Sequence, residues 1–153
     1  MQRVILFLAT GAGTGYFPYF PGTVGTLVAI PLSLAVNRTA TVSLFIPLSL
    51  LAALTLSAAW LCKRGEEILG EKDCQKIVVD EIAGFLLANF LSPPEFRATL
   101  MAFLLFRFFD IIKPFPVARL ESLKGGMGII LDDLSAGLYT LLILRLLSLG
   151  GLL

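Results

Sequence analysis

Apolar residues gather in long blocks along this chain, and the clearest block covers residues 39–62. This segment, TATVSLFIPLSLLAALTLSAAWLC, contains no charged residue. Because about 20 consecutive apolar residues can cross a bilayer as a helix, the block predicts a transmembrane helix. Pro47 lies near its start, where we expect it to mark the first turn or to kink the helix.

Shorter apolar blocks on both sides predict further helices. Residues 25–37 form one such block, and the Asn37-Arg38 pair after it predicts the turn of a helical hairpin. Of the three later blocks, the last is long enough to span a bilayer, whereas the other two, at about 15 residues each, are marginal. The three blocks are residues 134–152, 77–91 and 98–112. The stretch VILFLAT near the N-terminus is expected to be interfacial or re-entrant.

The block pattern predicts an all-α fold, a compact polytopic membrane bundle of about four to five helices in one domain, residues 1–153. The composition agrees, because 57% of the residues are hydrophobic and 15% are charged, against about 45–50% and about 25% in soluble proteins. The alternative is an apolar soluble helical bundle. The net charge of +1 and the absence of a basic run exclude nucleic acid as an expected partner.

The charged residues also predict an orientation. If the helices alternate in direction, one side of the membrane carries only Arg38 and Arg97. The other side collects Arg3, Lys63, Arg64, Lys72, Lys76, Lys113, Arg119 and Lys124. By the positive-inside rule the second side is cytoplasmic. No cleavable signal is expected, so the sequence predicts a multi-pass protein inserted as it stands.

The residue types that are missing narrow the chemistry. The chain has no His, which excludes Ser-His-Asp triads, phosphohistidine intermediates and His-ligated zinc. Cys62 and Cys74 are expected to be free and reduced, in keeping with chemistry that faces the cytosol. Neither cysteine has an Arg at the sixth following position, as a Cys-nucleophile phosphatase requires, since Asp80 stands there after Cys74.

Acidic residues next to apolar blocks are the candidates for chemistry, because carboxylates there are costly and need a cation. Three groups qualify, and the topology above brings all of them to the cytoplasmic side. They are Asp80-Glu81, the run Arg107, Asp110 and Lys113, and Asp132-Asp133. Structural alternatives remain open: first-turn carboxylates favour a helix N-terminus, and an Arg-Asp pair three residues apart can be a simple ion pair.

Oxygen ligands without His or thiolate predict Mg²⁺ as the cofactor. Such an ion can polarise a phosphoryl oxygen and supply a nucleophilic water, while Arg107 and Lys113 balance the charge that develops on the phosphoryl group. The Gly-rich segment GAGTGYFPYFPGTVGT, residues 11–26, is a candidate phosphate cradle together with the N-terminus of a helix that begins near Thr26. A loop that only caps two helices is the alternative.

Four strings carry a resemblance to a known family. FPGTVGTLVAIPL, IVVDEIAGF, LFRFFDIIKPFPVARLE and GGMGIILDDLSAG occur in this order and are spread along the chain between residue 11 and residue 140. They closely resemble the motifs of the phosphatidylglycerophosphatase A family. The resemblance implies a Mg²⁺-dependent enzyme of the bacterial inner membrane that hydrolyses phosphatidylglycerophosphate to phosphatidylglycerol and phosphate, in phospholipid synthesis. Some similar proteins are water-soluble and all-helical.

The motifs of this family assign the site residues by position. Asp80, Glu81, Asp132 and Asp133 are expected to hold one or two Mg²⁺ ions, with Asp110 as a further ligand or as base. Arg107 and Lys113 are expected to clamp the phosphomonoester. The PGTxGT element is expected to bind its remaining oxygens, through Gly22, Thr23, Gly25 and Thr26. Glu66 and Glu67 lie where similar proteins often have an acid, and the choice between them stays open.

Two other classes of protein remain as alternatives. A small transporter or channel would line an ion path with Arg107, Asp110 and Arg145, and would spread polar groups through the membrane depth. A membrane assembly factor would need no metal. Arg145, inside the last apolar block, is expected either to reach lipid head groups or to pair with an acid of another helix. The number of metal ions, the attacking group and the oligomeric state stay open.

Overall fold

The computed structural model describes residues 1–72, 74–115 and 126–152, and in these ranges the chain forms α-helices and no strand. Two short 3₁₀ helices, Thr14–Tyr16 and Thr39–Thr41, lie in connections. The α-helices are α1 (Gln2–Ala9), α2 (Pro21–Arg38), α3 (Phe45–Leu69), α4 (Val79–Ala88), α5 (Phe96–Ile112) and α7 (Gly126–Leu149). The all-α prediction is confirmed, with the short α1 in addition to the expected helices.

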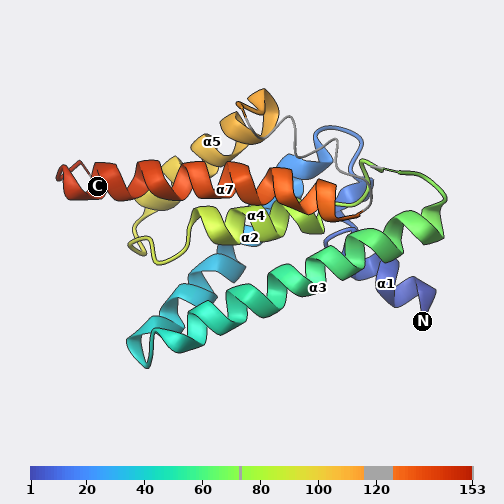
Figure 1. Cartoon of the computed structure of the whole chain (residues 1–153), viewed down its shortest axis with the longest axis horizontal. Helices are drawn as coiled ribbons and strands as arrows, with labels where there is room; N and C mark the ends of the chain where they lie inside the picture. Colours follow the sequence, from blue (N-terminus) through green and yellow to red (C-terminus); the bar gives the residue numbers. More distant parts are fainter. Residues whose placement is uncertain (73, 116–125, 153) are drawn as a thin grey trace.

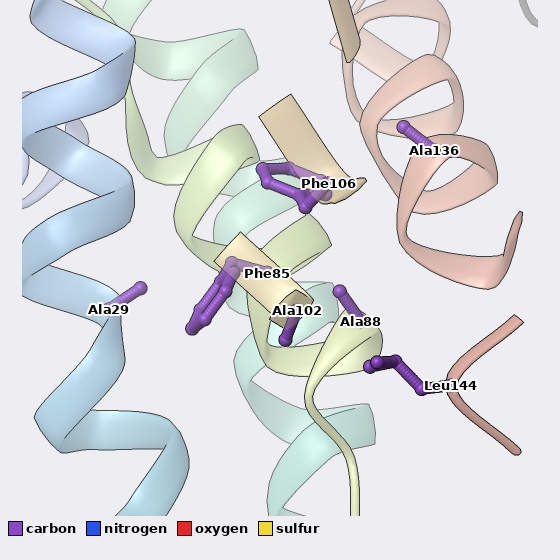
Figure 2. Close-up of a cluster of buried hydrophobic side chains, with 7 residues drawn as sticks. All are labelled: Ala29, Phe85, Ala88, Ala102, Phe106, Ala136 and Leu144. Atoms are coloured by element: carbon purple, nitrogen blue, oxygen red, sulfur yellow. The ribbon is translucent and has the colours of Figure 1, made fainter. Parts of the chain in front are cut away.

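The short helix α4 lies at the centre and packs against α2, α3, α5 and α7 (Figure 1). Its Phe85 meets Phe106 of α5 edge to face, with ring centroids 6.0 Å apart. Alanines of α2, α4, α5 and α7 surround this pair, as Figure 2 shows. Small residues let the helices approach closely: a Cβ atom added to Gly137 of α7 would collide with the carbonyl oxygen of Gly84 of α4. The centre of the bundle is therefore closely packed around α4.

The connections and termini gather at two ends of the bundle (Figure 1). One end, here called the site end, contains the N-terminus, the connection from α3 to α4 and the start of α7. The opposite end contains the turn from α2 to α3, the connection from α4 to α5 and the C-terminus. The predicted separation of basic residues follows these ends in the described ranges, since Arg38 and Arg97 belong to the opposite end. Arg119 and Lys124 lie outside the described residues.

Backbone carbonyls at the opposite end bind Arg145. Its Nη2 donates to the carbonyl oxygens of Phe90 and Leu91, at 2.9 and 3.1 Å, just beyond the C-terminus of α4. A cation is favoured at this position because carbonyls at a helix C-terminus lack partners. Among the described residues its partners are therefore backbone carbonyls and not an acid of another helix, and contact with a lipid head group stays a prediction.

One described helix, α3, is long and apolar enough to cross a membrane. Only 28% of its apolar window is buried inside the protein, whereas the core helix of a soluble bundle is mostly buried. Large apolar side chains are also exposed on α5 and α7, among them Leu104 and Leu146. An outer surface of this kind favours contact with lipid.

The block at residues 77–91 does not form a spanning helix. Helix α4 contains 10 residues, which rise about 15 Å against a hydrocarbon core of about 30 Å. It can reach only halfway across a bilayer. The multi-pass topology stays a prediction.

Candidate active site

A cavity of about 390 Å³ opens at the site end between α2, α4, α5 and α7. It collects all three acidic groups and both cations that the sequence predicted. Its lining consists of Phe20, Pro21, Gly22, Cys74, Gln75, Ile77, Asp80, Glu81, Arg107, Asp110, Lys113, Asp132 and Asp133. Groups far apart in the sequence thus share one polar space.

The first turn of α4 supplies Asp80 and Glu81. Asp80 is buried, and its Oδ1 accepts a hydrogen bond of 3.1 Å from the backbone N–H of Glu81. Carboxylates in the first turn interact favourably with the helix dipole, which offsets part of the cost of burying them. The Oε2 atom of Glu81 is buried without a hydrogen-bond partner. That orphaned oxygen indicates a missing cation or donor.

The last turns of α5 supply the cations. Arg107 Nη1 lies 2.6 Å from Asp110 Oδ2, close enough for an ion pair but without the alignment of a hydrogen bond. The Nε atom of Arg107 is also buried and has no acceptor. Lys113 follows the helix as its C-cap, and its Nζ lies 2.8 Å from Asp132 Oδ2 of α7. Arg107 therefore retains donor capacity that its ion pair does not use.

Helix α7 supplies Asp132 and Asp133 from within its length. The sequence placed this pair at the entry to the last helix, but α7 begins at Gly126, so the acids lie beyond its first turn. The dipole explanation for them was therefore wrong. The backbone N–H of Asp133 donates to Asp132 Oδ1 at 3.0 Å, while Asp133 Oδ1 is buried without a partner.

Burial and mutual repulsion disfavour the charged forms of these acids. Burial raises the pKa of Asp80 from 3.8 to about 6, and the charge of Asp132 adds to the effect. Burial, with the charges of Asp80 and Asp110, raises the pKa of Glu81 and of Asp133 well above their usual range. Arg107 opposes the shift at Glu81. The cavity therefore holds more acid than its own cations neutralise, which is typical of a functional site.

The carboxylate oxygens at the cavity suit a Mg²⁺ ion that the protein holds through only part of its coordination shell. In the described part of the chain, no three acidic or thiol side chains converge closely enough to enclose a metal. Mg²⁺ usually takes one or two carboxylates and completes its shell with waters and substrate phosphate. The partnerless oxygens of Glu81 and Asp133 at the cavity are candidates for such a carboxylate pair. Mg²⁺ itself stays a prediction.

The N-terminus of α2 forms the remaining wall. This helix begins at Pro21, earlier than the predicted start near Thr26. Gly22 lines the cavity, and a Cβ atom there would collide with the carboxylate of Glu81. Among the described residues, no acceptor is found for the N–H groups of Gly22 and Thr23. Free amides at a helix N-terminus can bind an anion.

Three residues that the sequence assigned to phosphate binding, Thr23, Gly25 and Thr26, lie outside the cavity lining. Thr26 is fully buried, and its hydroxyl donates to the carbonyl oxygen of Gly22 at 2.8 Å. Gly25 packs against the side chain of Val78, and Thr23 is not part of the lining either. The PGTxGT element thus builds the helix that presents Gly22, and the structure gives Thr26 and Gly25 no direct contact with the cavity.

Several lining residues escaped the sequence analysis. Phe20 lies within the predicted cradle, residues 11–26, but was not singled out there, and Gln75 carries no charge, so that only its nearness in sequence to the Asp80 group could have pointed to it. Cys74 also lines the cavity, and both cysteines are free, as predicted. Glu66 and Glu67 lie outside the lining, and Glu67 pairs with Arg64 at 2.6 Å.

Comparisons with known proteins agree with the motifs. The family described as phosphatidylglycerophosphatase A matches residues 7–148. A protein of Haemophilus influenzae named phosphatidylglycerophosphatase A is 35% identical over 141 residues, which cover 91% of this chain and 85% of that protein. The Escherichia coli protein of the same name is 32% identical over 139 residues, which cover 87% of this chain and 77% of that protein.

A Bacteroides thetaiotaomicron protein carries a different name, "Putative phosphatidylinositol-3-phosphatase". It is 35% identical over 144 residues, which cover 91% of this chain and 90% of that protein. No solved structure matches the chain. The resemblance found in the ordered motifs, and with it the expected class of lipid phosphomonoester phosphatase, is confirmed by the family match. The chain belongs to the phosphatidylglycerophosphatase A family.

Proposed function

We propose that this enzyme removes the terminal phosphate of phosphatidylglycerophosphate, in a Mg²⁺-dependent reaction, and leaves phosphatidylglycerol. The observation that carries the proposal is the cavity at the site end, where Arg107 and Lys113 face buried acids of two other helices. A phosphomonoester dianion complements the cations, and a divalent ion complements the acids. The proposal also rests on the family and on the names of two relatives.

The cations and the start of α2 bind the phosphate in this scheme. Arg107 has donors left over from its ion pair, and its planar guanidinium can hold two phosphate oxygens. Lys113 exchanges part of its contact with Asp132 for a phosphate oxygen. The N–H groups of Gly22 and Thr23 donate hydrogen bonds to another phosphate oxygen, and the dipole of α2 favours this contact. These donors also stabilise charge that builds up on the phosphoryl group.

The acids hold the ion and move protons. Asp80, Glu81, Asp132 and Asp133 would hold Mg²⁺, which supplies phosphoryl polarisation and an activated water when bound. Asp80, with a pKa near 6, can hold a proton at its carboxyl group and release it close to neutral pH. Asp110, paired with Arg107, is the candidate base or additional ligand.

The enzyme would lie in the bacterial inner membrane with its cavity at the cytoplasmic surface. The basic residues of the described site end support this orientation by the positive-inside rule. Helix α3 would span the bilayer, with α2, α5 and α7 crossing beside it, while the short α4 ends inside the membrane. Acids placed at the boundary remain accessible to water and metal.

An ion path through the membrane is not favoured. Arg107 and Asp110 form an ion pair at the cavity, whereas Arg145 binds carbonyls at the other end of the bundle. A phosphatase for a different lipid is the serious second candidate, because one relative is named for phosphatidylinositol 3-phosphate.

Phosphate release by the purified enzyme separates these functions. Detergent-solubilised phosphatidylglycerophosphate and phosphatidylinositol 3-phosphate are supplied separately, each with Mg²⁺ and with EDTA. We expect Mg²⁺-dependent release that is faster with phosphatidylglycerophosphate. Faster release from the inositol lipid would reassign the substrate, release unaffected by EDTA would remove the metal from the scheme, and no release from either lipid would overturn the proposal.

A further inference from the structure

The backbone that follows α5 brings Lys113 to the polar cavity in a conformation that its sequence does not favour. Lys113 has φ of 47° and ψ of 62°, in the left-handed region, which is costly for a residue with a side chain. Pro114 comes next, and a residue before proline prefers an extended conformation. A change of Lys113 to an extended conformation would reorient its side chain. Some contact with the rest of the protein must therefore hold this backbone.

Burial of apolar side chains contributes little to that restraint. Ile111 and Ile112, the last residues of α5, are 69% and 56% exposed, and the side chain of Phe115 is 71% exposed. The segment thus buries little apolar surface at this point. Polar contacts with the neighbouring helix α7 carry correspondingly more of its position.

Tyr139 of α7 makes such a contact. Its hydroxyl donates to the carbonyl oxygen of Phe115 at 2.9 Å. Its ring packs on that of Phe109, one turn before Lys113, with centroids 5.6 Å apart. Tyr139 thus contacts the chain on both sides of Lys113. On α7 it lies about two turns after Asp132, so the two side chains share one face of the helix.

The bond from Tyr139 differs from the other hydroxyl bond beside it. Thr140, the next residue of α7, donates to the carbonyl oxygen of Ala136 at 2.9 Å, and this bond stays within the helix. The bond from Tyr139 crosses to another element. Only Pro114 separates the acceptor residue from Lys113, and the proline ring fixes φ. A restraint on the Phe115 carbonyl is therefore passed on to Lys113.

We propose that Tyr139 is a positioning residue whose hydrogen bond to the Phe115 carbonyl keeps Lys113 turned towards the polar cavity. The proposal rests on the proposed function, in which Lys113 binds the phosphate. Tyr139 itself is not part of the cavity lining. When the phosphate draws the ammonium group away from Asp132, the bond from Tyr139 still restrains the backbone. Lys113 then cannot relax out of its left-handed conformation during the reaction.

A double-mutant cycle tests whether Tyr139 acts through Lys113. Tyr139→Phe removes the hydroxyl and keeps the ring against Phe109, and Lys113→Ala removes the ammonium group. We expect Tyr139→Phe to lower the kcat of phosphate release from phosphatidylglycerophosphate by about three- to tenfold, the effect of one hydrogen bond. In the Lys113→Ala background the same substitution should change kcat by less than about twofold.

Thr140→Val is the matched control, because it removes a hydroxyl of the same helix whose bond stays within α7. Its kcat should remain within about twofold of the parent protein in both backgrounds. An equal loss from Tyr139→Phe with and without the Lys113 side chain would show a general effect on stability and would overturn the proposal. An unchanged kcat of Tyr139→Phe beside native Lys113 would overturn it as well.

Hydrogen exchange in detergent tests the restraint without enzyme activity. The backbone N–H of Lys113 donates to the carbonyl oxygen of Phe109 at 2.9 Å. This amide should exchange about three to ten times faster in Tyr139→Phe than in the unaltered protein or in Thr140→Val. Equal exchange in the three proteins would contradict the proposal. No phosphate release by the unaltered enzyme would overturn the proposed function, whereas the exchange result decides separately whether Tyr139 holds Lys113.

Discussion

Lys113 Nζ lies 2.8 Å from Asp132 Oδ2, and the lysine reaches this position from a left-handed backbone conformation with φ of 47°. Lys113 is the C-cap of α5, a place where glycine is normally preferred. A non-glycine residue in such a conformation costs about 1–3 kcal/mol. Because Lys113 lines the cavity, this strain is consistent with a role for its positive charge that glycine could not supply.

The variant Lys113→Gly separates the effect of the ammonium charge on activity from the effect of backbone strain on stability. Glycine relieves the strain but removes the ammonium group, so we expect phosphate release to fall by about 10²–10³-fold. The unfolding temperature should stay close to that of the unaltered protein, because strain relief and loss of the ion pair oppose each other. A large drop in unfolding temperature would show that Lys113 mainly ties α5 to α7.

Gly22 is the second point of close approach. A Cβ atom at this position would meet the carboxylate of Glu81 and lie 3.2 Å from Arg107 Nη1. We therefore expect Gly22→Ala to displace both groups and to lower phosphate release by at least about tenfold. Gly150→Ala is the matched control, because its Cβ would make only ordinary contacts at the opposite end. Equal activity of the two variants would contradict the assigned geometry.

Arg107 is predicted to recognise the phosphate by the shape of its guanidinium. Arg107→Lys keeps the positive charge beside Asp110 but loses the planar fork. We expect a higher KM and a kcat reduced by about tenfold or more, measured by initial rates of phosphate release. Unchanged kinetics in the lysine variant would mean that Arg107 only neutralises Asp110.

Stability should depend on pH with a definite sign. The pKa of Asp80 is about 6 in the folded protein against an ordinary value of 3.8. Between these values the folded state holds a proton that the unfolded state has released, so the metal-free protein should lose stability as the pH rises from about 4 to about 6. The raised pKa values of Glu81 and Asp133 should extend this loss to higher pH.

Thermal unfolding in detergent at several pH values checks this trend. Mg²⁺ should raise the unfolding temperature more at about pH 7.5 than at about pH 5, because it binds deprotonated carboxylates. The Asp80→Asn variant should show a weaker dependence on pH between 4 and 6. Stability that rises across this range in the metal-free protein would contradict the described burial of Asp80.

The sequence predicted the helices and the composition of the site, because both depend on local pattern. The uncharged block at 39–62 corresponds to most of α3, and the acids at 80, 81, 132 and 133 do line one cavity. Helix starts were less predictable. Phe20 adopts a left-handed conformation before Pro21, and this allows α2 to begin earlier than the Gly-rich pattern suggested.

Roles that depend on packing could not be predicted. Thr26 was a candidate ligand by its motif, but helical geometry turns its hydroxyl towards Gly22 O. Arg145 finds its acceptors only because the connection after α4 turns beneath α7 at the opposite end. Both side chains bond to backbone carbonyl oxygens, and the position of such carbonyls cannot be read from the residue types near Thr26 or Arg145.

The central claim is that the buried acids of α4 and α7 act together with the α5 cations on a phosphomonoester. Asp133→Asn tests it most directly, because this substitution removes one charge from a buried side chain with nearly the same shape. Phosphate release from phosphatidylglycerophosphate in saturating Mg²⁺ should fall by about 10²–10³-fold, with an unfolding temperature at or above that of the unaltered enzyme. Activity within about threefold of the unaltered enzyme, about 0.7 kcal/mol in transition-state stabilisation, would contradict the account.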